Sequence, residues 1–174
     1  IGTYVANPNA VVEVADQYGG ANGTKYLALG NQSGGPGTVT LSLTHAADYF
    51  GLWWSAIDAQ NTLQIYSGGT SGTLLGTYTS AILSTLIPGL SASGYDGNPN
   101  YTPKPNMHEK YAYINFFADA GTSFDTIVFT NGPGTGFESD NHSVRSVPEP
   151  SALLMGGAAS IIGLAVARRR ARKA

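Results

Sequence analysis

The sequence predicts an all-β body followed by a single apolar helix, and three observations carry this prediction. Glycine accounts for 23 of 174 residues and charged residues for only 11%, which disfavours helical bundles and coiled coils because these need charged outer faces and few glycines. Hydrophobic residues reach 42%, enough to build a core and to argue against intrinsic disorder. Residues 151–167 contain no charged side chain.

Short runs of β-branched, aromatic and aliphatic residues, bounded by Gly, Asn, Pro or Ser, predict the strands of the body. In the run 38–44, Val39, Leu41 and Leu43 share one face and hydroxyl residues share the other, as in a half-buried strand. The run 111–117 alternates less clearly, which predicts a central strand covered on both faces. The predicted strands are 11–15, 24–29, 38–44, 49–57, 61–67, 73–79, 111–118, 125–130 and 136–144.

The segments between these runs are rich in Gly-Gly, Asn-Gly and Gly-Pro turn signals. One short helix is expected over 81–87, where Pro88 and Gly89 end it. Residues 88–106 hold four of the nine prolines and predict a long surface loop. Together these features favour a two-sheet antiparallel β-sandwich over residues 1–146, jelly-roll-like, with an immunoglobulin-like sandwich as the alternative.

The charge distribution and the lack of cysteine exclude several kinds of function. Residues 1–147 carry four basic and ten acidic residues, so an acidic body with dispersed lysines predicts no nucleic-acid partner, because phosphates require clustered Lys and Arg. The absence of cysteine excludes disulfides, thiolate metal sites and cysteine nucleophiles.

After Val147 the composition changes abruptly. Pro148, Glu149 and Pro150 neither continue a strand nor enter a helix interior, so they predict a stiff hinge. As a helix, residues 151–167 span roughly 25 Å, within the range of a membrane-spanning helix. By the positive-inside rule, the basic cluster that follows places this end in the cytoplasm. A buried C-terminal helix of the body and an amphipathic surface helix are the alternatives. The cluster consists of Arg168, Arg169, Arg170, Arg172 and Lys173.

The segment 147–174 resembles a PEP-CTERM sorting signal, which combines a Pro-Glu-Pro motif, one apolar helix and a terminal arginine cluster. The resemblance implies recognition by exosortase, a membrane-embedded cysteine transpeptidase of Gram-negative bacteria. It implies that Pro148, Glu149 and Pro150 carry recognition, that the helix 151–167 contacts inner-membrane lipid, and that the basic tail 168–173 sets the orientation. The body would be periplasmic first, and after cleavage near the hinge it would lie at the cell surface or outside the cell.

The body is similar to the β-sandwich ectodomains that such substrates carry, in the stretches 49–58, 61–63, 124–130 and 137–141. Those ectodomains share no common activity. The resemblance therefore implies a non-enzymatic surface or extracellular-matrix protein, with exopolysaccharide or other surface proteins as further partners.

No catalytic set is visible in the body. Ser71 lacks the glycine two residues later that a nucleophile elbow requires, and the three histidines (His45, His108 and His142) are far apart and expected at the surface or in turns. We therefore predict that the protein is not an enzyme. A secreted glycan hydrolase is the lowest-ranked alternative, because it requires two carboxylates at a defined separation, one with a raised pKa.

Two groups of residues are candidates for binding. Trp53 and Trp54 point to opposite faces of a strand, so we expect one in the core and the other exposed, where it would stack on a sugar ring of a carbohydrate ligand. Glu138 and Asp140 share one face of an extended strand, and their mutual repulsion would be relieved by Ca²⁺, with Asp58 as a further ligand. The alternative is that these carboxylates are solvated at a strand end. No other cofactor is expected.

Overall fold

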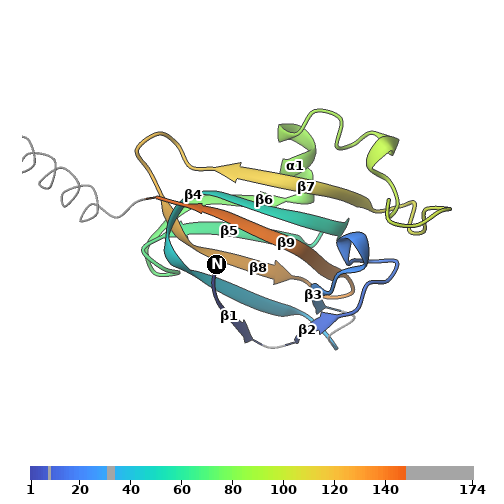
Figure 1. The fold of residues 1–174 in the computed structure, drawn as a ribbon, viewed down its shortest axis with the longest axis horizontal. Coiled ribbons are helices and arrows are strands. Elements are labelled where there is room, and N and C mark those ends of the chain that lie inside the picture. The colour runs from blue at the N-terminus through green and yellow to red at the C-terminus, as the bar shows by residue number, and fades with distance from the viewer. Residues whose placement is uncertain (8, 31–33, 148–174) are drawn as a thin grey trace, which may run out of the picture.

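The computed structural model describes residues 1–7, 9–30 and 34–147 (Figure 1). Besides its strands, this part of the chain contains one α-helix, α1 (Ser80–Leu86), and the short 3-10 turns Ala21–Gly23 and Ser93–Tyr95. The strands are β1 (Gly2–Asn7), β2 (Ala10–Glu13), β3 (Tyr26–Gly30), β4 (Gly37–Ile57), β5 (Asn61–Ser67), β6 (Thr73–Thr79), β7 (Lys110–Phe117), β8 (Phe124–Asn131) and β9 (Gly136–Ser146).

All pairings are antiparallel, and the described strands form one nine-stranded sheet in the order β2-β3-β9-β4-β8-β5-β6, with β1 and β7 also paired to β4. The 21-residue strand β4 connects its two halves. Residues 37–42 of β4 pair with β8, whereas residues 49–54 pair with β7, and the register shifts between Ser42 and Ala47. The sheet thus folds back on itself through β4, instead of forming the two separate sheets of the predicted sandwich.

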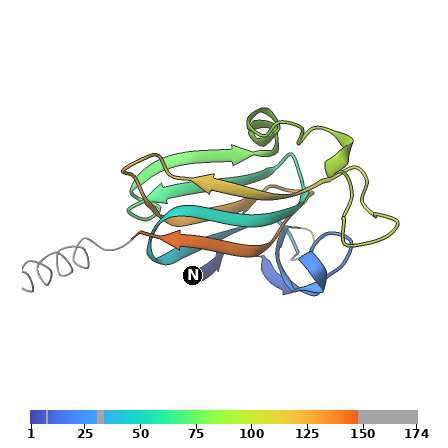
Figure 2. The same ribbon diagram turned by 45° about the horizontal axis from the view of Figure 1, so that its top comes forward.

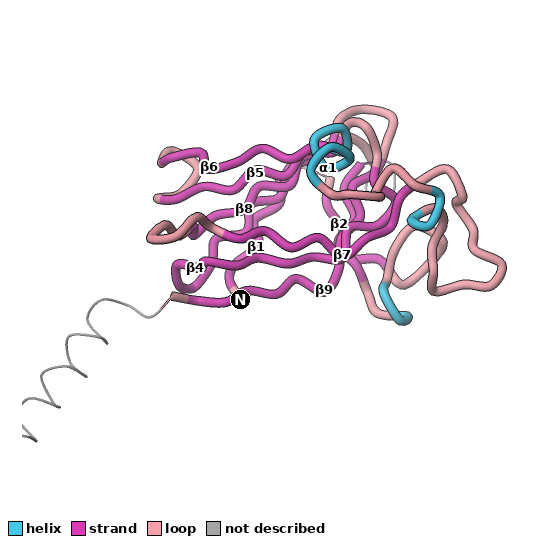
Figure 3. The backbone as a smooth tube through the Cα atoms, turned by 90° about the horizontal axis from the view of Figure 1, so that it is seen from above, coloured by secondary structure: helices cyan, strands magenta, loops and turns pink. Residues whose placement is uncertain are grey.

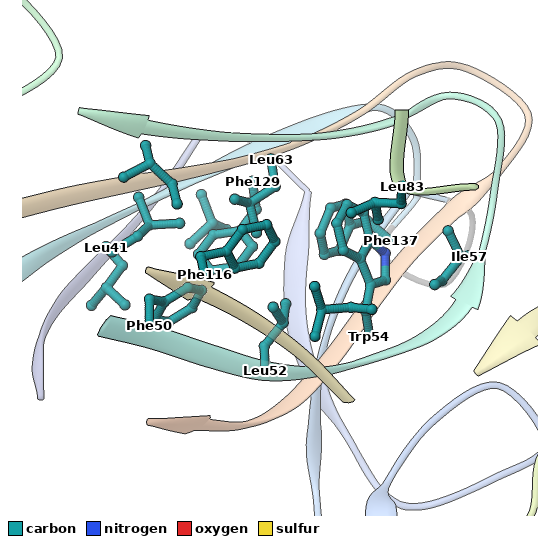
Figure 4. Packing of buried hydrophobic residues seen from close by; sticks show 14 of the residues in the cluster. Leu41, Phe50, Leu52, Trp54, Ile57, Leu63, Leu83, Phe116, Phe129 and Phe137 are labelled. Carbon is teal, nitrogen blue, oxygen red and sulfur yellow. The ribbon is translucent and has the colours of Figure 1, made fainter. Parts of the chain in front are cut away.

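Both halves of the sheet contribute to a single core. The inward side chains Phe50, Leu52 and Trp54 of β4 are completely buried (Figure 4). Across the core, Phe129 of β8 meets Phe50 and Phe137 edge-on, with ring centroids 6.2 and 5.6 Å apart. Trp54 stacks on Phe137 at 4.5 Å. This interlocked aromatic packing is what holds the folded sheet closed.

The predicted strands agree well with the structure in the half that contains β5 and β6. The predictions 61–67 and 73–79 coincide with these strands, and the predicted helix 81–87 is α1, whose first turn is capped by the Thr79 hydroxyl accepting from the Ile82 N–H at 3.3 Å. Residues 88–106 form the predicted long loop, which contains the 3-10 turn Ser93–Tyr95 and an isolated β-bridge from Asp96 to Lys110.

The structure differs from the strand predictions at three points. The runs 38–44 and 49–57 are one continuous strand, because the chain bends between them without a turn. β1 is not predicted by the sequence. It is an edge strand that pairs only with β4, which leaves Tyr4 and Val5 exposed. β7 is not covered on both faces: its inward residues are buried, whereas Tyr113 and Phe117 are exposed. Aromatic residues on its outer face hide the expected alternation.

The two ends of the folded sheet differ in character. The connections 14–25 and 88–109 gather at the end where β9 begins, and β9 ends at the opposite end (Figure 3).

Within the described part of the chain, no helix has the length and apolar character that a membrane crossing requires. The predicted spanning helix 151–167 lies outside the described residues.

Candidate functional site

The strands β7, β4 and β9 lie side by side in the sheet (Figure 2). Their outward face carries an ordered array of aromatic and polar side chains. Because side chains alternate along a strand, this array lies behind the inward residues Phe50, Leu52 and Trp54. The cross-strand rows, each in the order β7, β4, β9, are Phe117, Tyr49 and Arg145; then Asn115, Gly51 and Ser143; then Tyr113, Trp53 and Asp140.

Hydroxyl groups converge over Gly51, the residue without a side chain at the centre of this array. The Tyr49 hydroxyl donates to Asn115 Oδ1 at 2.9 Å, and the Tyr113 hydroxyl lies 2.6 Å from Ser143 Oγ. A Cβ atom at Gly51 would lie only 2.7 Å from the Tyr113 hydroxyl and 2.9 Å from Ser143 Oγ. The two tyrosine rings therefore lean along the sheet instead of standing away from it.

The rings of this array remain accessible. Phe117 is 66% exposed and Tyr113 40% exposed, and the rings of Tyr49 and Phe117 lie 5.1 Å apart. We call Tyr49, Tyr113, Phe117, Asn115 and Ser143 the aromatic face. Beside it, Arg145 makes two hydrogen bonds to Asp48, at 2.7 and 3.0 Å, and the guanidinium lowers the pKa of Asp48.

The structure separates the two tryptophans that the sequence singles out. Trp54 is completely buried, and its indole N–H donates to Asn61 Oδ1 at 3.3 Å, so its ring is not available to a ligand. Trp53 lies half-buried on the outer face, with its ring 6.5 Å from that of Tyr111. Tyr113 and Phe117, not the tryptophans, provide the exposed rings of this face.

At the end of the sheet where the long connections gather, three carboxylates line an open cleft of about 410 Å³. They are Asp58, Glu109 and Glu138. Burial raises the pKa of Asp58, although its carboxylate accepts a hydrogen bond from the Gly136 N–H at 3.1 Å. Burial, together with the charge of Asp58, also raises the pKa of Glu109. We call this site the acidic cleft.

The predicted Ca²⁺ ligands are only partly brought together. Asp58 and Glu138 share the acidic cleft, whereas Asp140 lines a different cavity and accepts a hydrogen bond from the Thr24 hydroxyl. Among the described residues, no three histidine or acidic side chains are grouped so that they could hold a metal ion. Glu109 was missed by the sequence analysis, because nothing in its local sequence indicates that its loop folds over Asp58.

The cavity that Asp140 lines, about 460 Å³ in volume, also contains a hydrogen-bonded chain through His142. His142 Nδ1 lies 2.7 Å from the Tyr4 hydroxyl, and its Nε2 lies 3.0 Å from Ser139 Oγ. The imidazole stacks on Phe129 at 5.2 Å, and its burial lowers the pKa of His142 to about 4.

This Ser-His pair is structural. Ser139 is only 1% exposed, and an imidazole with so low a pKa is a weak base at neutral pH. The chain of hydrogen bonds instead ties β1 to β9. His142 is half-buried within β9 instead of lying at the surface or in a turn, whereas His45 and His108 are exposed as predicted.

The hydrogen-bonded sheet continues to the last residue that the structure describes. The Val147 N–H donates to the Ala46 carbonyl oxygen at 2.9 Å, one residue beyond the end of β9. The predicted sorting residues Pro148, Glu149 and Pro150, and the arginines Arg168, Arg169 and Arg170, lie outside the described residues.

Comparison with known protein families identifies a PEP-CTERM protein-sorting motif at residues 146–171. A search of curated protein sequences found no match for the chain. The motif begins at Ser146, where β9 ends. The chain thus carries, directly after an antiparallel β-sheet body, the PEP-CTERM motif of an exported protein that is sorted by exosortase.

Proposed function

We propose that the protein is a non-enzymatic component of the cell surface or extracellular matrix of a Gram-negative bacterium, released from an inner-membrane anchor by exosortase. The position of the motif carries this proposal. The described sheet pairs its last strand through Ser146 and makes a further backbone hydrogen bond at Val147, so the Pro-Glu-Pro segment follows at once. Cleavage near this segment would remove none of the described strands.

The chemistry of the segment supports the same interpretation. Pro148 and Pro150 lack a backbone N–H, so they cannot extend the ladder of β9. An extended peptide at this point would be open to a transpeptidase at the membrane. In this proposal the stretch 151–167 spans the inner membrane, and Arg168, Arg169 and Arg170 remain in the cytoplasm, with the body in the periplasm until it is cut.

Cell fractionation of a Glu149→Ala variant tests the sorting step. We expect the variant to accumulate in the membrane fraction, while the parent protein reaches the surface or the medium. Asp119→Ala is the matched control, because it removes the same charge from an exposed loop at the same end of the sheet as Val147. An unchanged distribution of the Glu149→Ala variant would count against recognition of the Pro-Glu-Pro segment.

A second candidate function for the body is carbohydrate binding. The exposed rings of Tyr113 and Phe117, side by side with hydroxyl and amide groups, favour it. Of the two tryptophans, only Trp53 lies on this surface. Glycan binding by the full chain, lost on substitution of the exposed rings, would support this function.

Ca²⁺ binding at the acidic cleft stays a proposal, with two of its three predicted ligands in place. Asp58 and Glu138 face the cleft, and Glu109 also lines it. If Ca²⁺ binds there, its addition should raise the Tm of the parent protein, and Asp58→Asn should abolish the increase. Asp140→Asn should leave the increase intact, because Asp140 lines another cavity.

A further inference from the structure

The aromatic face combines accessible aromatic rings with a hydrogen-bonded chain of polar groups. Phe117 and Tyr113 are exposed, although each inward neighbour on β7 is buried. Between them, the Tyr49 and Tyr113 hydroxyls are held by Asn115 and Ser143. The arrangement is thus fixed before any ligand arrives, which reduces the entropy that binding would cost.

The position of Gly51 explains how the rings are oriented. Both tyrosine hydroxyls reach over this residue, where even a methyl group would collide with them. A ring whose hydroxyl end is drawn down to the sheet shows one of its flat sides to the solvent. Flat aromatic surfaces bordered by hydrogen-bonding groups match the chemistry of a pyranose ring, whose faces are apolar C–H groups and whose rim is hydroxylated.

The length of the aromatic face indicates that its ligand is a polysaccharide chain and not a single sugar. Phe117 and Tyr113 are four residues apart on β7, a separation of about 13 Å along a strand. Two exposed rings at that distance, with Asn115 on the strand between them, form an open strip. A strip of this kind suits a polymer lying along β7 better than it suits a small molecule, which would need a concave pocket.

The charge of the body indicates which class of polymer the aromatic face would bind. Residues 1–147 carry ten acidic and four basic residues, so the body repels polyanions. Arg145, at the end of the strip, is engaged by the carboxylate of Asp48. A neutral chain meets no such repulsion, whereas an acidic polysaccharide or nucleic acid does.

We propose that the aromatic face is a binding site for a neutral polysaccharide chain, with Phe117 and Tyr113 as stacking platforms and Asn115 and Ser143 as hydrogen-bonding groups. This inference gives the second candidate function its site and its ligand class, and it is independent of the sorting step. It moves the binding residues from the tryptophans of β4 to outward side chains of β7 and β9.

Affinity electrophoresis of the full chain tests the proposal. Native gels would contain a β-glucan, a galactomannan or hydroxyethyl cellulose as neutral probes, and alginate as an anionic probe. We expect retardation by at least one neutral probe and none by alginate. Phe117→Ala and Tyr113→Ala should each weaken the retardation constant about tenfold. Tyr101→Ala is the matched control, because Tyr101 is 38% exposed in the loop 88–106, and it should bind like the parent protein.

Several results would overturn the inference. These are no retardation by any neutral probe, retention that persists in a Tyr113→Ala/Phe117→Ala double variant, and retention by alginate alone. Sedimentation that shows a dimer of the parent chain and a monomer of Phe117→Ala would assign the face to a second copy of this chain instead. Phe117→Ala keeps the test decisive if Tyr113→Ala fails to fold, because Phe117 is mostly exposed. Sorting is read out separately by Glu149→Ala in cells, so failure of one proposal is distinguishable from failure of the other.

Discussion

The two faces of β4 have similar residue types but different environments. Phe50, Leu52 and Trp54 point inward and are completely buried against the opposite half of the folded sheet. Tyr49 and Trp53 point outward, where they meet hydroxyl groups and the aromatic side chains of β7. The comparison teaches that aromatic content does not identify the core in this protein. A β4 side chain belongs to the core only if it faces the opposite half of the folded sheet. The outward aromatic side chains of β4 remain available for other contacts.

Truncation of an inward ring should have the largest effect on stability. Trp54→Ala removes the ring that stacks on Phe137, and we expect it to lower the free energy of unfolding by about 3–5 kcal/mol. Phe117→Ala, on the outer face, should change it by less than about 0.5 kcal/mol. Urea unfolding of both variants measures the difference, and equal losses would contradict the assignment of the two faces.

Acid should destabilise the fold through His142. Burial lowers its folded-state pKa to about 4, below the ordinary value of 6.5, so the folded protein favours the neutral imidazole. The stabilisation is complete above pH 6.5 and is lost as the pH falls toward 4, by up to about 3 kcal/mol.

Unfolding measured across this pH range in a His142→Gln variant isolates the effect of the imidazole. The difference in stability between the parent protein and the variant should shrink as the pH falls. His45→Gln serves as the control, because it removes an exposed histidine. A constant difference between parent protein and His142→Gln would show that the imidazole is not protected in the fold.

A methyl group at Gly51 should disturb the outer face at modest cost. In Gly51→Ala the new Cβ would collide with the hydroxyl ends of two tyrosine side chains and with Ser143 Oγ, which are side-chain atoms and not backbone. We expect a loss of about 1 kcal/mol in the free energy of unfolding, accompanied by a change in tyrosine fluorescence. A loss as large as that of Trp54→Ala would mean that the outer face is packed like the core.

The smallest effect is expected from the ion pair at the end of β9. The Arg145 side chain is 65% exposed, so its interaction with Asp48 is screened by solvent. A double-mutant cycle of Arg145→Gln and Asp48→Asn should give only a weak coupling energy, which decreases further at high salt. A larger, salt-independent coupling would indicate that this corner is buried by a further contact.

Local patterns predicted what depends on local sequence. The strands 61–67 and 73–79 follow from alternation and turn residues, and the helix 81–87 follows from its end at Pro88 and Gly89. The path of β4 was not predictable from local sequence, because a bend that carries one strand through both halves of a sheet leaves no turn signal. The acidic cleft is also a tertiary feature: Asp58, Glu109 and Glu138 come from segments that are distant in the sequence.

The candidate sites divide in the same way. The sorting motif was predictable because hinge, apolar stretch and arginines are contiguous, and comparison with known families confirms the motif. The aromatic face was not predictable from the sequence, because Tyr49, Tyr113 and Ser143 are brought together only by the register of three strands. Trp53 and Trp54 are prominent in the sequence, but their burial is decided by which face of β4 meets the other half of the sheet.

Intact-mass analysis of the protein recovered from the native cell surface tests the central claim most directly. Sorting through the motif at residues 146–171 predicts a mature chain that ends near Pro148–Pro150 and lacks Arg172 and Lys173, and it predicts that cells without exosortase retain the full mass. A surface-exposed protein that still carries Arg172 and Lys173 would contradict the account.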